Sequence, residues 1–148
     1  MIRNLSTYAP SSNYDQMMKK LSNKGIRPTK QRMILAKLLF EKGDRHISAE
    51  ELYKEVEKEN RKLSLATIYN TLKQFTNMGL LKELVIDQNK SIYCSNHDSH
   101  YHLYIEDEGK IIDIPQKNID LNIPELPACL KLHNIDIIVK IRTLKEKH

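Results

Sequence analysis

Apolar residues recur at helical spacing through the first half of the chain. One stripe follows Pro28-Thr29 and consists of Ile34, Leu35, Leu38 and Leu39. Another lies between Leu65 and Asn77 and consists of Leu65, Ile68, Leu72 and Phe75. Spacings of three and four residues are typical of a helix that buries one face. Shorter amphipathic runs at 14–23 and after Ser48 bring the number of predicted helices to four.

Start and turn signals support this division of the first half. Ser48-Ala-Glu-Glu51 is a capping box, in which the Ser and Glu side chains satisfy backbone N–H groups at the start of a helix. Ser64 is a suitable N-cap for the helix that follows it. Two strand-like runs, 81–86 and 91–94, flank a polar turn and predict a hairpin. Four helices and a hairpin predict a winged helix-turn-helix domain over residues 1–96.

The second half changes to β-rich patterns. Runs at 101–105 and 110–114 are joined by a polar turn that ends in Gly109, and residues 135–144 alternate mostly with period two. A small sheet with an exposed edge is unstable alone, and pairing with a second copy would stabilise it. We therefore predict an α+β protein, with the N-terminal winged helix-turn-helix followed by a small α/β dimerisation domain over residues 97–148, assembled as a homodimer.

Charge and composition indicate the class of partner. Residues 1–86 hold 16 Lys or Arg and 9 Asp or Glu, a balance of +7, whereas residues 87–148 hold 8 and 10, a balance of −2. A basic half next to a mildly acidic half suggests that the first half meets a polyanion such as DNA. No apolar run is long enough to cross a bilayer, and residues 1–10 lack a secretory signal pattern, so we expect a cytoplasmic protein without a membrane partner.

The predicted helix 65–77 has an unusual polar face, which carries no acidic residue. Its outward positions are Ala66, Thr67, Tyr69, Asn70, Lys73, Gln74 and Asn77. Most of these side chains carry a hydroxyl, amide or phenol group. Such groups can hydrogen-bond base edges or contact the thymine methyl in a major groove. The alternative is a merely solvated helix, which would carry more Glu–Lys pairs.

Histidines cluster at the start of the second half. His97, His100 and His102 lie within six residues, and strand alternation puts His100 and His102 on one face. Two imidazoles could therefore meet one metal ion or one haem iron; the alternative is a solvated loop. A small zinc hydrolase built on these three histidines is the rival function, although no nucleophile motif or phosphate loop accompanies them.

Three motifs resemble the ferric uptake regulator family. They are Arg27-Pro-Thr-Lys-Gln-Arg32, His46-Ile-Ser-Ala-Glu-Glu-Leu-Tyr53 and Leu65-Ala-Thr-Ile-Tyr-Asn-Thr-Leu-Lys-Gln-Phe75. Within the family, Gly109-Lys-Ile-Ile-Asp-Ile-Pro115 and the C-terminal run 135–142 are most similar to the iron response regulator branch. The resemblance implies a dimeric transcriptional repressor or activator of iron and haem genes that binds a palindromic, AT-rich operator. Together with the polar helix face, it gives seven expected DNA-binding residues: Arg27, Thr29, Arg32, Thr67, Tyr69, Asn70 and Lys73.

The resemblance also implies a sensing site that joins both halves of the chain. Its positions here are His46, Cys94, His100, His102 and Asp113. Cys94 departs from the family, which usually has a carboxylate there. A thiolate is a softer ligand and would favour zinc over iron or manganese, or offer haem an axial sulfur. The alternative is that Cys94 is a small buried residue and no ligand. The expected cofactor is thus a divalent metal (zinc, iron or manganese) or haem.

Overall fold

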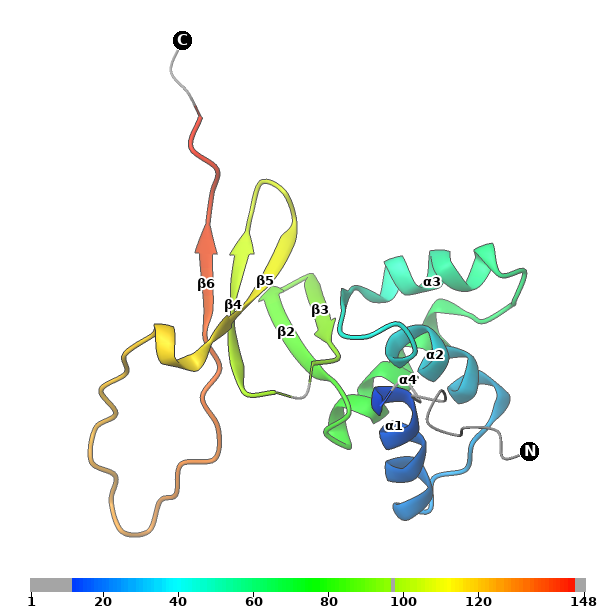
Figure 1. Ribbon diagram of the computed structural model, residues 1–148, viewed down its shortest axis with the longest axis horizontal. Helices are drawn as coiled ribbons and strands as arrows, with labels where there is room; N and C mark the ends of the chain where they lie inside the picture. The colour runs from blue at the N-terminus through cyan, green and yellow to red at the C-terminus, as the bar shows by residue number, and fades with distance from the viewer. Residues whose placement is uncertain (1–11, 97, 146–148) are drawn as a thin grey trace, which may run out of the picture. The chain divides into compact units, whose positions relative to one another are not determined.

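A computed structural model of the chain describes residues 12–96 and 98–145 (Figure 1). The chain divides into two compact units, residues 1–97 and 98–148. The sequence places its predicted domain boundary at 96/97, and the roles expected of the two domains stay predictions. None of the helices in the described ranges is long and apolar enough to cross a membrane.

The described part of the first unit contains the four predicted helices. They are α1 (Ser12–Asn23), α2 (Lys30–Phe40), α3 (Ala49–Lys58) and α4 (Leu65–Asn77). Three of them begin at capping side chains: Thr29, Ser48 and Ser64 accept hydrogen bonds from backbone N–H groups in the first turns of α2, α3 and α4. The capping box of Ser48 and Glu51 is present in both directions. Short-range side-chain signals therefore set these helix starts.

The core of this unit is a single apolar cluster contributed by all four helices and the adjoining strands. Phe40 at the end of α2 and Phe75 in α4 meet there with ring centroids 6.1 Å apart. The prediction that Leu65 is buried was wrong, because its side chain is 37% exposed at the first turn of α4. Thr71 is buried in α4 instead, and its hydroxyl is satisfied by donating to the Thr67 carbonyl at 2.9 Å.

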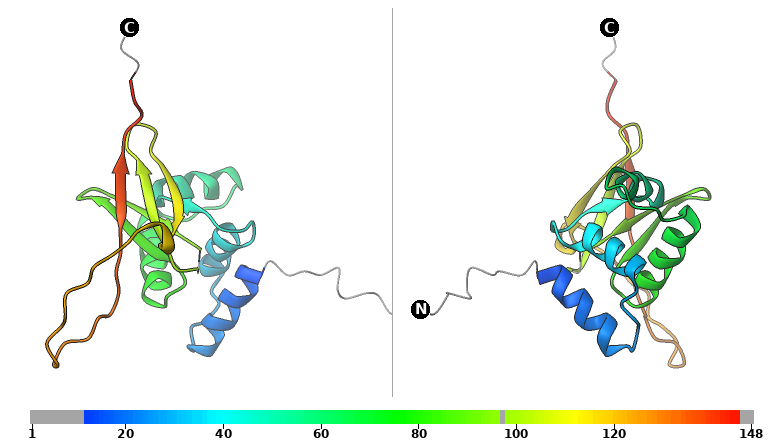
Figure 2. Two further views of the ribbon diagram at one scale, coloured as in Figure 1. Left: turned by 60° about the vertical axis from the view of Figure 1, so that its left-hand side comes forward. Right: turned by 90° about the vertical axis from the view of Figure 1, so that its right-hand side faces the viewer.

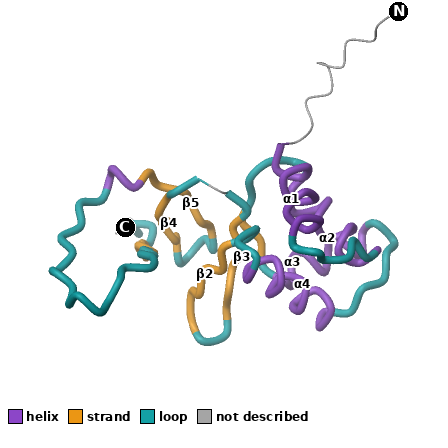
Figure 3. The backbone as a smooth tube through the Cα atoms, turned by 90° about the horizontal axis from the view of Figure 1, so that it is seen from below, coloured by secondary structure: helices purple, strands orange, loops and turns teal. Residues whose placement is uncertain are grey.

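Three strands complete the first unit. The predicted hairpin is formed by β2 (Lys82–Asp87) and β3 (Lys90–Cys94), which Figure 3 shows as orange strands joined by a teal turn. The sequence pattern missed β1 (His46–Ile47), which pairs antiparallel with β3 on the side away from β2. A strand of two residues is too short to show a period of two, and only its partner reveals it.

A polar clamp holds β1 against β3. Arg45 donates two hydrogen bonds to the Glu55 carboxylate, at 2.9 and 2.7 Å, and a third to the Leu38 carbonyl at 3.0 Å. Its backbone N–H donates to the Ser95 hydroxyl at 2.9 Å, and the Ser95 N–H donates to the Arg45 carbonyl at 3.1 Å. Arg45 precedes His46 and Ser95 follows Cys94, so the clamp fixes the strand pair that carries both residues.

The second unit contains one three-stranded sheet in the order β5-β4-β6. β4 (His100–Ile105) and β5 (Lys110–Pro115) are antiparallel neighbours, as their tight polar turn predicted. β6 (Ile138–Ile141) runs parallel to β4, and it is shorter than the predicted strand over 135–144. The difference arises because β4 ends at Ile105, so residues after Ile141 have no ladder partner; Arg142 and Thr143 bond the side chains of Glu106 and Asp107 instead.

A long segment connects β5 to β6, which lie on opposite sides of β4 in the sheet. It begins with the 3-10 helix η2 (Gln116–Asn118), the only helical element among residues 98–145. Residues 120–137, called the arm below, contain neither helix nor strand, and they loop away from the sheet of their own unit (Figure 2). The exposed large apolar side chains of the arm are Leu121, Ile123, Leu126, Leu130 and Leu132.

The clamp generates a prediction about stability. Glu55→Gln replaces a two-pronged charged pair with a weaker amide contact and should lower the free energy of unfolding of the first unit by about 1–2 kcal/mol. Urea denaturation followed by the helical circular dichroism signal measures this loss. Glu41→Gln, which makes the same chemical change at an exposed position of the first unit, should shift the free energy by less than about 0.5 kcal/mol. Equal effects of the two substitutions would contradict a stabilising clamp.

Candidate functional site

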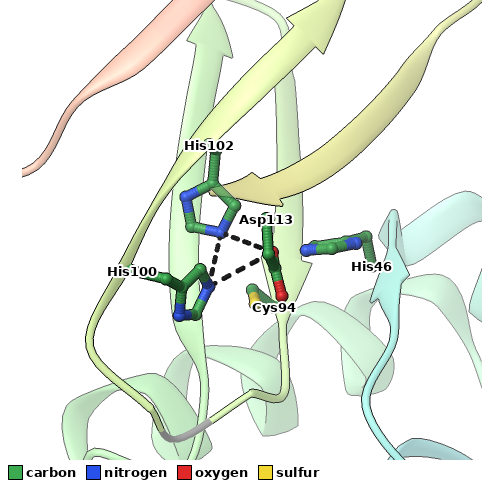
Figure 4. Close-up of side chains that lie close together, drawn as sticks. All are labelled: His46, Cys94, His100, His102 and Asp113. Carbon is green, nitrogen blue, oxygen red and sulfur yellow. Dashed lines mark hydrogen bonds and ion pairs between the residues drawn. The ribbon is translucent and has the colours of Figure 1, made fainter. Parts of the chain in front are cut away.

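Three ligand-type side chains converge within the second unit. His100 and His102 lie two residues apart on β4 and so face the same side, and Asp113 is the residue on β5 paired with His102. The Nε2 atoms of the two histidines are 2.8 Å apart. Asp113 Oδ1 lies 3.2 Å from His100 Nε2 and 3.3 Å from His102 Nε2, as Figure 4 shows. We call these three residues the His–Asp cluster.

The cluster is buried and its first histidine is oriented from behind. His100 is 6% exposed and His102 1% exposed, while the Asp113 side chain keeps 28% of its surface. His100 Nδ1 forms a hydrogen bond with the backbone carbonyl of Asp98. A carbonyl can only accept, so Nδ1 donates in this bond, and Nε2 is the ring nitrogen that faces His102 and Asp113 and would bind a metal ion. Outer hydrogen bonds of this kind set the ring orientation of metal-binding histidines.

The donor atoms of the cluster fit a divalent metal ion. Two imidazole nitrogens and one carboxylate oxygen suit zinc, iron or manganese. Ligand bonds of about 2.0–2.1 Å in a tetrahedral arrangement hold neighbouring donor atoms about 3.3 Å apart. The two nitrogen–oxygen separations of 3.2 and 3.3 Å match that spacing, and the nitrogen–nitrogen separation of 2.8 Å is somewhat shorter. Three donors already face one point, so a small rearrangement would suffice to bind an ion.

The first unit brings the other two expected ligands together. His46 on β1 is the register partner of Cys94 on β3, and a ring nitrogen of His46 lies within 4.8 Å of the Cys94 sulfur. Cys94 is 1% exposed and His46 is half-buried. This burial suits either alternative for Cys94, a thiolate ligand or a small packed residue. The pair is held in place by the Arg45–Glu55 clamp on one side and Ser95 on the other.

The polar face predicted for α4 is displayed at the surface. Tyr69, Asn70 and Lys73 are exposed, together with Ala66, Gln74 and Asn77. Thr67 is half-buried, and its hydroxyl shares a hydrogen bond of 2.8 Å with the N-cap Ser64. The face therefore presents one phenol, several amides and one lysine, the group types that read base edges and contact phosphates.

The expected DNA-binding residues near α2 already make contacts within the unit. The Thr29 hydroxyl accepts the Arg32 N–H at 3.3 Å as the N-cap of α2. The Arg32 guanidinium donates to the Arg27 carbonyl at 2.8 Å and to the Gln74 side chain at 3.2 Å. Arg32 thus ties the start of α2 to the polar face of α4. Contact of these three residues with DNA stays a prediction.

Sequence reasoning missed a residue that touches the polar face of α4. Glu50, in the first turn of α3, accepts a hydrogen bond from the Tyr69 hydroxyl. This bond is the largest cause of the raised pKa of Tyr69. The signal in the sequence was the pair of acids after Ser48: a capping box uses only Glu51 and leaves Glu50 for another partner. The phenol it meets lies 19 residues further along, beyond any local pattern.

His97 lies outside the described residues, so the three-histidine hydrolase site is represented only by His100 and His102. Their Nε2 atoms lie 2.8 Å from each other and 3.2 and 3.3 Å from Asp113 Oδ1.

Comparisons with known proteins connect this geometry to one family. Residues 23–141 match the ferric uptake regulator family. The chain is 35% identical over 100 residues to the peroxide-responsive repressor PerR of Staphylococcus saprophyticus subsp. saprophyticus. The aligned stretch covers 68% of this chain and 67% of that protein. The fold of this chain is similar to the Vibrio cholerae ferric uptake regulator, with a TM-score of 0.66, 27% identity, and 84% and 98% of the two chains covered. A zinc-bound manganese uptake regulator gives a TM-score of 0.60 and 25% identity, covering 86% and 98%.

These similarities confirm the α+β fold class and the family resemblance, and they lend no support to a hydrolase. A match that spans 23–141 includes α2 to α4, the hairpin, and all three strands of the second unit. The chain belongs to the ferric uptake regulator family, and it is accordingly a transcriptional regulator of the metal-responsive kind.

Proposed function

We propose that this protein binds palindromic, AT-rich operator DNA as a homodimer in the cytoplasm, and that a divalent metal ion at the His–Asp cluster controls the binding. The observation that carries the proposal is the convergence of His100, His102 and Asp113 on one buried point. A buried set of two nitrogens and one oxygen, spaced as metal ligands are, has its simplest use in holding an ion.

We further propose that His46 and Cys94 complete the coordination of that ion. The cluster supplies three donors, and zinc, iron and manganese in proteins take four or more. The family resemblance places a ligand at each of these two positions, and both are available as an adjacent pair on β1 and β3. An ion held by residues of both units would favour one arrangement of those units. The change in the free energy of DNA binding would then be limited by the difference between the ion's affinities for the two arrangements.

The geometry favours a metal ion over haem as the signal. The two Nε2 atoms lie 2.8 Å apart on one side of the cluster, whereas a haem iron takes its two axial ligands from opposite sides of a wide plane. Iron is the metal suggested by the similarity to the iron response regulator branch. The Cys94 thiol favours zinc, so we propose these two as the first metals to test.

DNA recognition is proposed for the exposed face of α4. The Tyr69 ring and the Asn70 amide would meet base edges, while Lys73 and Arg27 would meet phosphates. Support comes from the exposure of Tyr69, Asn70 and Lys73 on a helix without acidic residues, and from the basic balance of residues 1–86. Thr29, Arg32 and Thr67 would contact DNA only in addition to the intramolecular hydrogen bonds they already make.

Dimerisation is proposed for the second unit. Its sheet has three strands, and the five large apolar side chains of the arm remain between 41% and 60% exposed. A free arm of this kind would be poorly stabilised, and a second copy would cover its leucines and isoleucine. Two copies would also hold two reading helices at the spacing that a palindromic operator requires.

The metal proposal predicts that His100→Ala with His102→Ala removes the binding of Zn²⁺, Mn²⁺ and Fe²⁺, because two of three convergent donors are lost. Calorimetric titration of tag-free, metal-depleted protein measures stoichiometry and affinity, and a haemin titration tests the other cofactor class. His133→Ala, at an exposed position of the arm, is the matched control and should bind as the original protein does. Unchanged stoichiometry in the double variant would remove the metal site from this cluster.

Cys94→Asp tests the fifth ligand. A carboxylate is a harder donor than a thiolate, so the preference should shift from zinc toward manganese and iron. Competition between Zn²⁺ and Mn²⁺ for the same protein gives the ratio of affinities. An unchanged ratio would mean that Cys94 is a packed residue and no ligand.

The DNA proposal predicts different effects for two exposed residues of α4. Tyr69→Ala should weaken the best duplex selected from a random-sequence pool by about 1–3 kcal/mol and leave binding to a scrambled duplex nearly unchanged. Lys73→Ala should weaken both duplexes alike and lower the slope of log affinity against log salt by about 1. Fluorescence anisotropy at several salt concentrations measures both. Equal losses on the two duplexes for Tyr69→Ala would rule out base reading by this residue.

The dimer proposal predicts that Leu130→Asp weakens self-association at least about tenfold, since a charge would replace an apolar contact in the interface. Leu130 is 60% exposed in the arm, and Leu144, which is 93% exposed, supplies the control Leu144→Asp. Sedimentation equilibrium of the full chain gives the dimer dissociation constant. The proposal fails if both variants dimerise as the original protein does, or if both lose the dimer equally.

A further inference from the structure

We propose that Glu50 is a positioning residue that decides which bases Tyr69 recognises. It accepts the hydrogen bond from the single O–H of the phenol, so the Tyr69 oxygen can act toward DNA only as a hydrogen-bond acceptor. The inference rests on the proposed function, because it assumes that Tyr69 meets base edges. It adds a residue of α3 to the recognition surface, and it states whether the Tyr69 hydroxyl donates or accepts the hydrogen bond to a base.

The contact joins two helices of the first unit. Tyr69 projects from α4 and is 41% exposed, and its hydroxyl donates to Glu50 Oε1 on α3. Glu50 occupies the first turn of α3, where a negative charge is stabilised by the free N–H groups of the helix start. Its neighbour Glu51 is committed to the capping box with Ser48. Glu50 therefore takes no part in the capping box, and its carboxylate faces the phenol.

The chemistry of the two groups fixes the direction of the bond. A phenol has one proton to donate and can also accept, whereas an ionised carboxylate can only accept. The proton must therefore point at Glu50, and a bond to an ionised partner is roughly twice as strong as a neutral one. The lone pair left on the Tyr69 oxygen is the group available to a ligand at the exposed face.

This direction has a consequence for base recognition. In the major groove, adenine N6 and cytosine N4 carry amino hydrogens, whereas guanine O6 and N7 and thymine O4 are acceptors. An oxygen that can only accept will pair with the amino groups and be repelled by the acceptors. Tyr69 should therefore favour adenine or cytosine at the base it touches. Without Glu50, the hydroxyl could rotate and donate to guanine or thymine as well.

The surroundings of the pair keep both phenols of this region protonated. Tyr93 of β3 is buried, and burial, followed by the charges of Glu83 and the nearby Tyr69 and Glu50, raises its pKa to about 12. The hydrogen bond to Glu50, burial and the charge of Glu50 raise the pKa of Tyr69. A phenol that stays neutral keeps the proton on which the assigned direction depends.

The first part of the test uses the full-length protein without DNA. Tyrosine labelled with ¹³C at Cζ reports the ionisation of each phenol by NMR, and Tyr69→Phe assigns the Tyr69 signal. Glu50→Ala should lower the pKa of Tyr69 toward that of an ordinary exposed tyrosine. Glu57→Ala is the matched control, because it removes an acid from the same helix that accepts a hydrogen bond from Tyr53. It should lower the pKa of Tyr53 and leave the pKa of Tyr69 unchanged. An unchanged pKa of Tyr69 in the Glu50→Ala variant would overturn the inference.

The second part measures base preference with full-length protein loaded with Zn²⁺. The duplex selected by the original protein from a random pool is substituted with all four bases at each position, and Tyr69→Phe identifies the position that depends on the hydroxyl. At that position Glu50→Ala should reduce discrimination for adenine or cytosine over guanine or thymine by about two- to tenfold. Glu50→Gln, which keeps an acceptor but removes the charge, should retain most of the discrimination.

A double-mutant comparison separates a role through Tyr69 from a general charge effect. Both Glu50 variants lose a negative charge near the phosphates, so both should bind every duplex somewhat more tightly. In the Tyr69→Phe background, Glu50→Ala should cause no further loss of base discrimination. A further loss there, or full discrimination in Glu50→Ala alone, would overturn the inference. If instead Tyr69→Ala and Tyr69→Phe change no base preference, base reading by Tyr69 itself fails, whatever Glu50 does.

Discussion

The antiparallel register of β4 and β5 is the constraint on which the candidate metal centre depends. It sets Asp113 opposite His102, and the alternation of β4 sets His100 on the same side two residues away. A shift of one residue in that register would turn Asp113 to the other face of the sheet and leave two buried imidazoles without their carboxylate. The register is itself set by the short turn between Ile105 and Lys110, where Gly109 adopts a φ of 65°.

In the first unit, one side of α4 is buried and the other side is polar and accessible. Ile68, Leu72 and Phe75 are fully buried against the other helices. The opposite side of the same helix then faces outward as a consequence of helical periodicity. Contacts from Arg32 to Gln74 and from Tyr69 to Glu50 restrain that polar side. Side chains that are ordered before binding lose less conformational entropy when they meet a partner.

The two units also differ in how much of their apolar surface they bury. The first unit has a continuous cluster of buried residues from helices and strands. The described part of the second unit buries Tyr101, Tyr104 and the two cluster histidines, and its arm leaves large aliphatic side chains exposed. A three-stranded sheet with so little cover gains less from folding alone than the first unit does. That imbalance is the physical basis for the proposal that the second unit carries the dimer contact.

Local patterns of the sequence determined the four helices, their capping residues, the hairpin and the placement of His100 and His102 on one face. All of these depend on residues within a turn or two of one another, because helix and strand periodicity and capping act over that range. The family motifs also named the candidate ligands and the candidate DNA-binding residues, without showing what surrounds them.

The tertiary structure alone decided what those residues touch. It pairs His46 on the two-residue strand β1 with Cys94 on β3. It also sets Asp113 against His100 and His102, and it brings Glu50 to Tyr69. It also exposes Leu65, buries Thr71 and shortens the last strand. Each of these outcomes depends on a register or a helix–helix contact between segments that are apart in the chain. Such pairings arise from the packing of whole elements, and no periodicity within a single segment encodes them.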